Sequence, residues 1–190
     1  KSLRRLRDKG LALISEDRHH QGLWMDESVV LNAGIGFEDK NGFSSGGWIN
    51  SRKWAETVTS WLRDFDVRFE SGDLAVRRLS GGNQQKVIFA RELSGRKNRL
   101  IVAHQPTRGV DFASVRLIHD RILKARDSGS AVLVISSELD ELFELSDRIL
   151  VLCGGKKTGV FDREANGFSR ESIGAAMTDT NSRSDLKAHA

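Results

Sequence analysis

Short apolar segments alternate with amphipathic segments through the second half of this chain, and no other feature constrains the fold as strongly. Each apolar segment has the length of a buried strand, and the segments between them carry apolar residues at helical spacing. Nearly all-apolar strands separated by helices are typical of a parallel sheet covered on both faces. We therefore predict an α/β fold with strands at Leu100–Ala103, Ala131–Ile135 and Ile149–Cys153 and a helix over residues 111–126.

The first half contains one strong helix signal. Its apolar residues recur on one helical face, namely Trp54, Val58, Trp61, Leu62 and Phe65, and we interpret the two tryptophans as core packing. Further predicted elements are a helix over Ser2–Lys9 with Ser2 as its N-cap and a strand at Leu11–Ile14. A turn at Gly154-Gly155 should lead to an edge strand at Thr158–Phe161, and Ser169 should cap a last helix that ends at about Met177. The polar residues 178–190 are predicted to form a disordered tail.

The composition argues against two kinds of protein. No segment approaches the ~20 consecutive apolar residues of a membrane-spanning helix, so a membrane role must come through a partner. The net charge is +4, but the densest basic cluster, Lys1–Lys9, lacks the aromatic residues that would stack on bases. We therefore expect a solvated basic surface and no nucleic-acid partner. The single cysteine, Cys153, fits a reducing cytoplasm, and we interpret it as a small core residue.

The segment Leu79–Lys86 carries the clearest chemical signal, because Ser80 and two glycines precede a helix. The first N–H groups of a helix have no internal partner, and the helix dipole adds roughly half a positive charge there. Glycines keep side chains away from those N–H groups, and a serine adds a hydroxyl donor. This pattern predicts an anion site, with an ordinary helix N-cap as the alternative.

The order and spacing of three segments resemble the ABC ATPase family. After Leu-Ser-Gly-Gly-Asn-Gln-Gln-Lys come a strand ending in His-Gln-Pro-Thr-Arg-Gly-Val-Asp and a second strand followed by Ser-Ser-Glu-Leu-Asp-Glu. Together with the upstream Ser-Glu-Asp-Arg, they look most like the second, degenerate cassette of the double-cassette sugar and nucleoside importers. The resemblance implies a P-loop NTPase-like cassette over residues 1–177, with a parallel sheet and a helical subdomain at about 20–75.

The resemblance also implies roles for individual residues. The signature residues would contact the terminal phosphate of an ATP, with its Mg²⁺, that is held mainly by another cassette; these residues are Ser80, Gly81, Gly82 and Asn83. Glu16 stands at the Q-loop glutamine position. Asp111 would make the D-loop contact across the cassette pair, or alternatively act only as the N-cap of the next helix. No metal site is expected in this chain.

Three further positions depart from the family pattern. His104 stands where the family has the aspartate that serves Mg²⁺, and a neutral imidazole suits that hard cation poorly. Gln105 replaces the glutamate that polarises water, and an amide is not a base near neutral pH. Ser137 occupies the switch-histidine position. No Gly-x-x-x-x-Gly-Lys-Ser/Thr loop occurs, so we expect it upstream of Lys1 and expect this chain alone to be inactive.

These observations predict a peripheral, energy-coupling part of an importer on the cytoplasmic face of the membrane. Its expected partners are a first cassette of the same subunit, transmembrane permease subunits and, indirectly, a substrate-binding protein. The alternatives are a soluble ABC-type ATPase that acts on nucleic acid or ribosomes, and a non-catalytic interaction module. The sequence does not distinguish a sugar from a nucleoside cargo.

Overall fold

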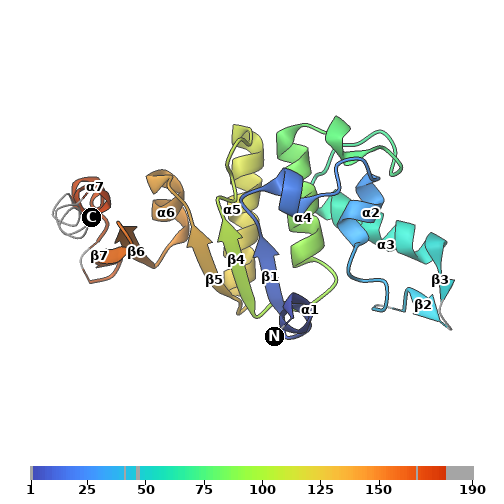
Figure 1. Cartoon of the computed structure of the whole chain (residues 1–190), viewed down its shortest axis with the longest axis horizontal. Helices are drawn as coiled ribbons and strands as arrows, with labels where there is room; N and C mark the ends of the chain where they lie inside the picture. Colours follow the sequence, from blue (N-terminus) through green and yellow to red (C-terminus); the bar gives the residue numbers. More distant parts are fainter. Residues whose placement is uncertain (1, 41, 46–47, 166, 179–190) are drawn as a thin grey trace, which may run out of the picture. The chain divides into compact units, whose positions relative to one another are not determined.

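The computed structural model describes residues 2–40, 42–45, 48–165 and 167–178, and the chain divides after Ile135 into two compact units. The first unit contains α1 (Leu3–Asp8), β1 (Leu11–Ile14), the π-helical turn η1 (Arg18–Gly22), α2 (Val29–Gly34), β2 (Ser44–Ser45), β3 (Trp48–Ile49), α3 (Ser51–Asp64), the 3-10 turn η2 (Val76–Arg78), α4 (Gly81–Leu93), β4 (Leu100–His104), α5 (Phe112–Asp127) and β5 (Ala131–Ile135). The second contains α6 (Leu139–Leu145), β6 (Arg148–Cys153), β7 (Lys156–Asp162) and α7 (Arg170–Met177). Figure 1 shows this order.

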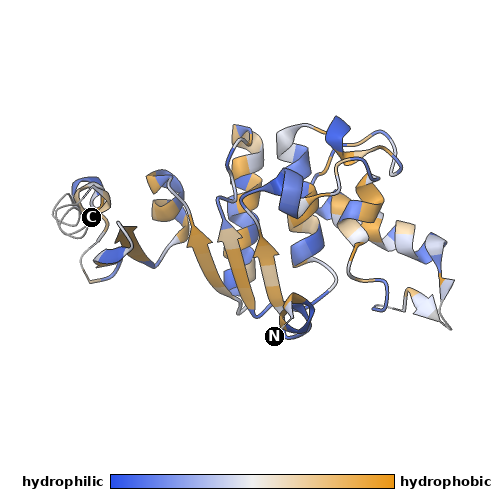
Figure 2. Ribbon diagram, viewed as in Figure 1, coloured by the Kyte–Doolittle hydropathy of each residue, from blue (hydrophilic) through white to orange (hydrophobic). Residues whose placement is uncertain are grey.

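A parallel sheet lies at the centre of the first unit, as the sequence predicts. Its strands run in the order β1-β4-β5 (Figure 1), and each is hydrogen-bonded in parallel to its neighbour. Leu100 of the central strand pairs with Leu11 on one side and with Ala131 on the other. The strands are coloured mainly as hydrophobic in Figure 2. This register brings the carboxyl ends of β1 and β4 together, and the residues that follow them meet there.

The two strands of the second unit form a hairpin. β6 pairs antiparallel with β7, because Gly154 and Gly155 both have positive φ and close a two-residue turn between Cys153 and Lys156. In the first unit, Leu133 and Ile135 of β5 are 51 % and 44 % exposed. β5 is the last strand of the sheet within the first unit, and its side chains alternate between half-buried and exposed.

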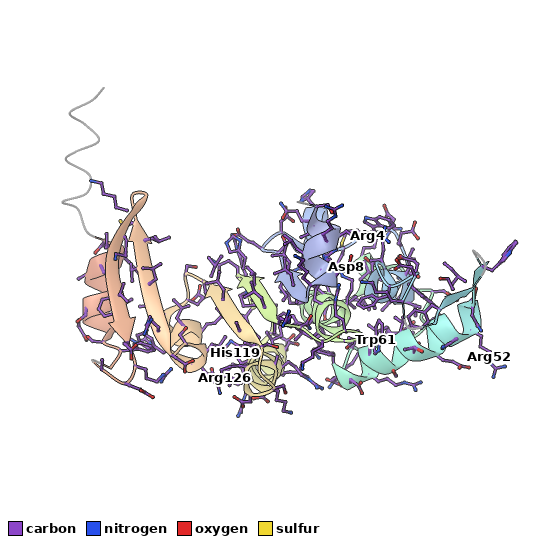
Figure 3. All side chains as sticks on the ribbon, turned by 90° about the horizontal axis from the view of Figure 1, so that it is seen from below. Arg4, Asp8, Arg52, Trp61, His119 and Arg126 are labelled. Atoms are coloured by element: carbon purple, nitrogen blue, oxygen red, sulfur yellow. The ribbon has the colours of Figure 1, made fainter. Side chains whose placement is uncertain are left out.

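The predicted amphipathic helix is α3, and its apolar face forms an aromatic core with α2 and the following loop. Trp54 and Trp61 are both buried, and their rings meet Phe43 and Phe37 edge to face at centroid distances of 5.1 and 5.0 Å. Trp61 projects from α3 in Figure 3. A side chain at Gly34 would overlap the ring of Trp54, so α2 can approach α3 this closely only with glycine there. The interpretation of both tryptophans as core packing is confirmed.

A buried ion cluster joins α4 to α1 and β1, and the sequence analysis did not predict it. The side chain of Glu92 is fully buried. Its Oε1 accepts hydrogen bonds from Arg7 at 3.0 Å and Arg91 at 3.1 Å, and its Oε2 lies 3.5 Å from Arg96. The amide N–H of Leu13 in β1 also donates to Oε2 at 3.4 Å. Burial lowers the pKa of Arg91, and the charge of Glu92 opposes that shift.

The second unit has a small core of its own around Ile149, Val151 and Ile173. Ser169 caps α7 as predicted, since its side chain accepts a hydrogen bond from the amide of Ser172. Cys153 is half-buried at the end of β6, so its interpretation as a core residue is wrong. Of the predicted tail, residues 179–190 lie outside the described part of the chain. Among the described residues, no helix is long and apolar enough to cross a membrane.

Candidate functional site

The signature segment forms the start of α4, and Ser80 is its N-cap. Ser80 is extended, and its Oγ accepts hydrogen bonds from the backbone amide of Asn83 at 3.4 Å and from the Asn83 side chain at 3.1 Å. The side-chain oxygen Oδ1 of Asn83 in turn accepts a hydrogen bond from the backbone amide of Arg68 at 3.0 Å. Helix geometry leaves the N–H groups of Gly81 and Gly82 without an intrahelical carbonyl. The exposed Ser80 hydroxyl therefore stands beside backbone donors that have no partner within the helix.

The polar residues after the glycines anchor this helix, a role that the sequence analysis missed. Gln84 donates to the carbonyl of Leu79 at 3.1 Å, and Gln85 donates to the carbonyl of Pro106 at 2.8 Å. The ammonium group of Lys86 donates to the backbone carbonyl of Asp66 at 2.9 Å. All three anchoring side chains belong to buried residues. The sequence signal for this role is the run of two amide side chains and a lysine soon after the helix N-cap. Such side chains need hydrogen-bond partners when they are buried, and here they find them in neighbouring backbone carbonyls.

The two glycines are required by close packing inside the chain. A Cβ on Gly82 would lie 2.2 Å from Oδ2 of Asp111 and 2.7 Å from Oγ of Ser114. A Cβ on Gly81 would lie 3.0 Å both from a guanidinium nitrogen of Arg18 and from the carbonyl oxygen of Gly109. The sequence predicts that both glycines leave the first N–H groups open to a phosphate. The structure adds a second reason for glycine, since the space that a Cβ would take is occupied by the chain's own groups.

Asp111 is the N-cap of α5, which confirms the simpler of its two predicted roles. Its Oδ1 accepts from the amide of Ser114 at 3.0 Å, and its Oδ2 accepts from the Ser114 hydroxyl at 2.8 Å. These hydrogen bonds hold the pKa of Asp111 below its ordinary value of 3.8. The carboxylate also lies against Gly82, so the first turns of α5 and α4 pack directly on each other.

We expect Asp111→Asn to reduce the pH dependence of stability. A carboxyl group with a lowered folded-state pKa stabilises the chain above its unfolded pKa, and this contribution is lost as pH falls through the folded-state value. Asparagine caps helices about as well but does not titrate. The melting-temperature advantage of the natural chain over the variant should therefore be full near pH 6 and shrink below about pH 4. An advantage that stays constant down to pH 2 would contradict this assignment.

Glu16 and His104 are brought together at the carboxyl ends of β1 and β4. One carboxylate oxygen of Glu16 lies 3.4 Å from Nε2 of His104, and the other is paired with the guanidinium of Arg108. All three side chains are partly exposed. The negative charge of Glu16 is thus already compensated by a cation of the same chain, at the place where the resemblance implies a magnesium site.

Gln105 and Ser137, the other two positions that depart from the family pattern, belong to different units of the chain. Gln105 follows β4 with φ +50°, a left-handed conformation that is uncommon for a residue with a side chain. Its backbone N–H donates to the carbonyl oxygen of Ile135 at 2.7 Å. Ser137 belongs to the second unit, between β5 and α6. Within the described ranges, no group of three or more His, Cys, Asp or Glu residues could hold a metal ion.

The segment Ser15–Arg18 contains a residue that the sequence analysis named only as part of a motif. Asp17 accepts hydrogen bonds from the amides of His19 and His20, at 3.1 and 3.0 Å, and thereby begins η1. These bonds also lower the pKa of Asp17. Arg18 then reaches across to the loop after β4, where it donates to the carbonyl of Arg108 at 2.9 Å.

ATP is the cofactor that the resemblance implies, and the described residues suit one part of it. The start of α4 offers unpaired N–H groups, the Ser80 hydroxyl and the positive end of a 13-residue helix, all of which favour a phosphate oxygen. Glu16, paired to Arg108 and His104, does not offer a free carboxylate to a cation. The start of α4 therefore suits a contact with a phosphate group, whereas the carboxylate of Glu16 already has partners within the chain.

Comparison with known proteins identifies the relatives of this chain. No family model matches it. The chain is 37 % identical over 178 residues to the nucleoside import ATP-binding protein NupA of Lactococcus lactis, a match that covers 94 % of this chain and 35 % of NupA. It is 34 % identical over 181 residues to the ribose import ATP-binding protein RbsA of Geobacillus kaustophilus, covering 95 % of this chain and 36 % of RbsA. The chain thus spans about a third of the length of these relatives.

A solved structure shares the fold. The ATP-binding cassette MJ0796, in a dimeric post-hydrolysis state bound to ADP and Pi, superimposes with a TM-score of 0.68 over 83 % of this chain and 65 % of that chain, at 19 % identity. This similarity establishes the fold alone. The chain therefore has the fold of an ABC-type ATP-binding cassette, with a parallel sheet and a helical subdomain, and its homologues are ATP-binding proteins of nucleoside and sugar import.

Proposed function

We propose that this chain is part of the ATP-binding, energy-coupling subunit of an ABC importer for nucleosides or sugars. The observation that carries the proposal is the match, along almost the whole chain, to proteins named for nucleoside and ribose import. The cassette fold and the capped start of α4 are consistent with it. In such an assembly the chain would act at the cytoplasmic face of the membrane with transmembrane permease subunits and, through them, a substrate-binding protein.

We further infer that the chain supplies its signature segment to an ATP held by another cassette. Ser80 and the first N–H groups of α4 are presented by a helix that is anchored along its length by buried polar side chains. Catalysis of phosphoryl transfer depends mainly on positioned donors and charge stabilisation, so donors brought by a second cassette can determine its rate. The other cassette would be the first one of the same subunit.

The chain's own nucleotide site would then be degenerate. His104 and Glu16 form a contact with each other, Arg108 compensates the carboxylate, and Gln105 provides no base. The helical subdomain, at about residues 20–75, would transmit closure to the permease. Its exposed aromatic side chains, Trp24 at 60 % and Trp48 at 83 % exposure, are consistent with a surface that meets another protein.

We expect the isolated 190-residue chain to hydrolyse no ATP and to bind it only weakly. The reason is the pairing of Glu16 with His104 and Arg108, together with the amide at position 105. Phosphate release and nucleotide binding by the purified chain test this expectation. Turnover by the pure chain that Gln105→Ala abolishes would overturn the proposal of a degenerate site.

A further inference from the structure

Arg18 lies beside the start of the signature helix, although it is 63 residues away in the sequence. Its Nη1 donates to the carbonyl of Arg108 at 2.9 Å. Its Nη2 lies 3.0 Å from the position that a Cβ of Gly81 would occupy. The missing side chain of Gly81 is therefore what lets the guanidinium approach the first turn of α4.

Neighbouring residues hold the turn that carries Arg18. The carboxylate of Asp17 caps η1, and Arg18 is the first residue of that turn. A Cβ on Gly22, at the end of η1, would lie 2.8 Å from the side chain of Ile88, so this turn packs directly on α4. His19, next to Arg18, contacts the side-chain oxygen of Gln84 at 3.2 Å. The turn that carries Arg18 is thus packed against α4.

The charge of Arg18 is not compensated by a carboxylate of the described residues. Glu16 is paired with His104 and Arg108, and the side chain of Asp17 is paired with His20 at 2.8 Å. Arg18 takes part in none of the ion pairs of this part of the chain, and its contacts are to a backbone carbonyl and to an imidazole nitrogen at 3.4 Å. A guanidinium on a half-buried residue, without a carboxylate partner among the described residues and next to the first N–H groups of α4, favours an anion.

We propose that Arg18 is a further phosphate-contacting residue of the signature site, whose Nη2 donates to the terminal phosphate that meets the start of α4. This proposal rests on the proposed function, because that phosphate belongs to ATP on the other cassette. Arg18 adds a full positive charge where Ser80 and the N–H groups offer only dipoles. Nη1 stays bound to the Arg108 carbonyl, so the guanidinium also ties the loop after β4 to the same phosphate.

The test uses the whole importer subunit with its permease and measures closure without requiring turnover. Fluorescence energy transfer between dyes on the two cassettes reports the ATP concentration that gives half-maximal closure. We expect Arg18→Gln to raise that concentration about tenfold or more, the usual effect of losing a hydrogen bond to a charged group. Arg18→Lys should recover part of the loss, since lysine keeps the charge but cannot bridge two acceptors.

The controls separate a phosphate contact from a structural role. Arg4→Gln removes the same charge from an exposed side chain of α1 (Figure 3) and should leave closure unchanged. The melting temperature of each Arg18 variant should stay close to that of the natural chain, because the hydrogen bond to the Arg108 carbonyl is exposed. An Arg18→Gln variant that closes like Arg4→Gln, or an Arg18→Lys variant as defective as Arg18→Gln, would overturn the proposal. If Ser80→Asp also leaves closure intact, the proposed function fails with it; if Ser80→Asp abolishes closure, only the role of Arg18 fails.

Discussion

Gly82→Asp is expected to lower ATP hydrolysis and transport by the reconstituted importer by about a hundredfold or more. Losing one preorganised donor to developing negative charge costs about 3 kcal/mol, which corresponds to that factor. The new carboxylate would also bring a negative charge to the start of α4, where the proposed function requires a phosphate. Transport and phosphate release by the full complex, measured one variant at a time, give the result.

Close packing at residue 82 adds a second physical reason for the loss of activity in Gly82→Asp. The side chain of residue 82 would point at Asp111 and Ser114, at distances too short for any Cβ, and not directly at a phosphate. The variant must therefore push the start of α5 away from α4 and place two carboxylates side by side. We expect both the donor geometry and the local packing to be lost, so a lower melting temperature should accompany the loss of activity.

A second variant isolates the charge effect from the packing effect. Ser80→Asp keeps a good helix N-cap at an exposed position, so the chain should fold normally, but it places a carboxylate at the proposed phosphate contact. Ser80→Asn is its neutral match and also caps helices well. We expect the aspartate variant to lose most ATP hydrolysis and the asparagine variant to retain much more, with similar melting temperatures for both.

Substitutions at the degenerate positions His104 and Gln105 are the comparison for Gly82→Asp and Ser80→Asp. His104→Ala and Gln105→Ala should each have far smaller effects, because neither side chain performs the role that its position has in the family. Near-normal hydrolysis in both Gly82→Asp and Ser80→Asp, or a collapse of activity in Gln105→Ala alone, would contradict the proposed division of roles between the two cassettes.

Glu92→Ala is expected to lower the free energy of unfolding by about 3–5 kcal/mol, the usual effect of removing one partner from a buried ion pair. The fully buried carboxylate is the common acceptor for Arg7 and Arg91 and lies near Arg96. Without it, these guanidinium groups lie in or near the core without their anion. The amide of Leu13 in β1 also loses an acceptor. Urea denaturation of the purified chain measures the change.

Two further glutamate variants make the result decisive. Glu56→Ala removes an exposed ion pair with Arg52 on α3 and should cost only about 0.5 kcal/mol. Glu92→Gln keeps the shape and one acceptor oxygen but loses the charge, so its urea midpoint should lie between the other two. If Glu92→Ala leaves the chain unfolded in water, the glutamine variant still gives a midpoint. Equal midpoints for Glu92→Ala and Glu56→Ala would show that the cluster contributes little.

The sequence by itself determined the local structure, because caps and periodicity act over a few residues. Each N-cap serine or aspartate that the pattern indicated accepts a hydrogen bond from an amide three residues later; these residues are Ser2, Ser80, Asp111 and Ser169. The apolar face of α3 and the strands of the parallel sheet were predictable for the same reason. The family-specific spacing of the signature and the two following strands then indicated the cassette fold.

Only the tertiary structure decided which side chains meet. The pairing of Glu16 with His104 and the approach of Arg18 to Gly81 depend on the register of β1 against β4 and on the packing of η1 on α4. The burial of Glu92 likewise depends on how α4 lies against β1. Spacing along the chain does not encode such contacts, since they join residues tens of positions apart.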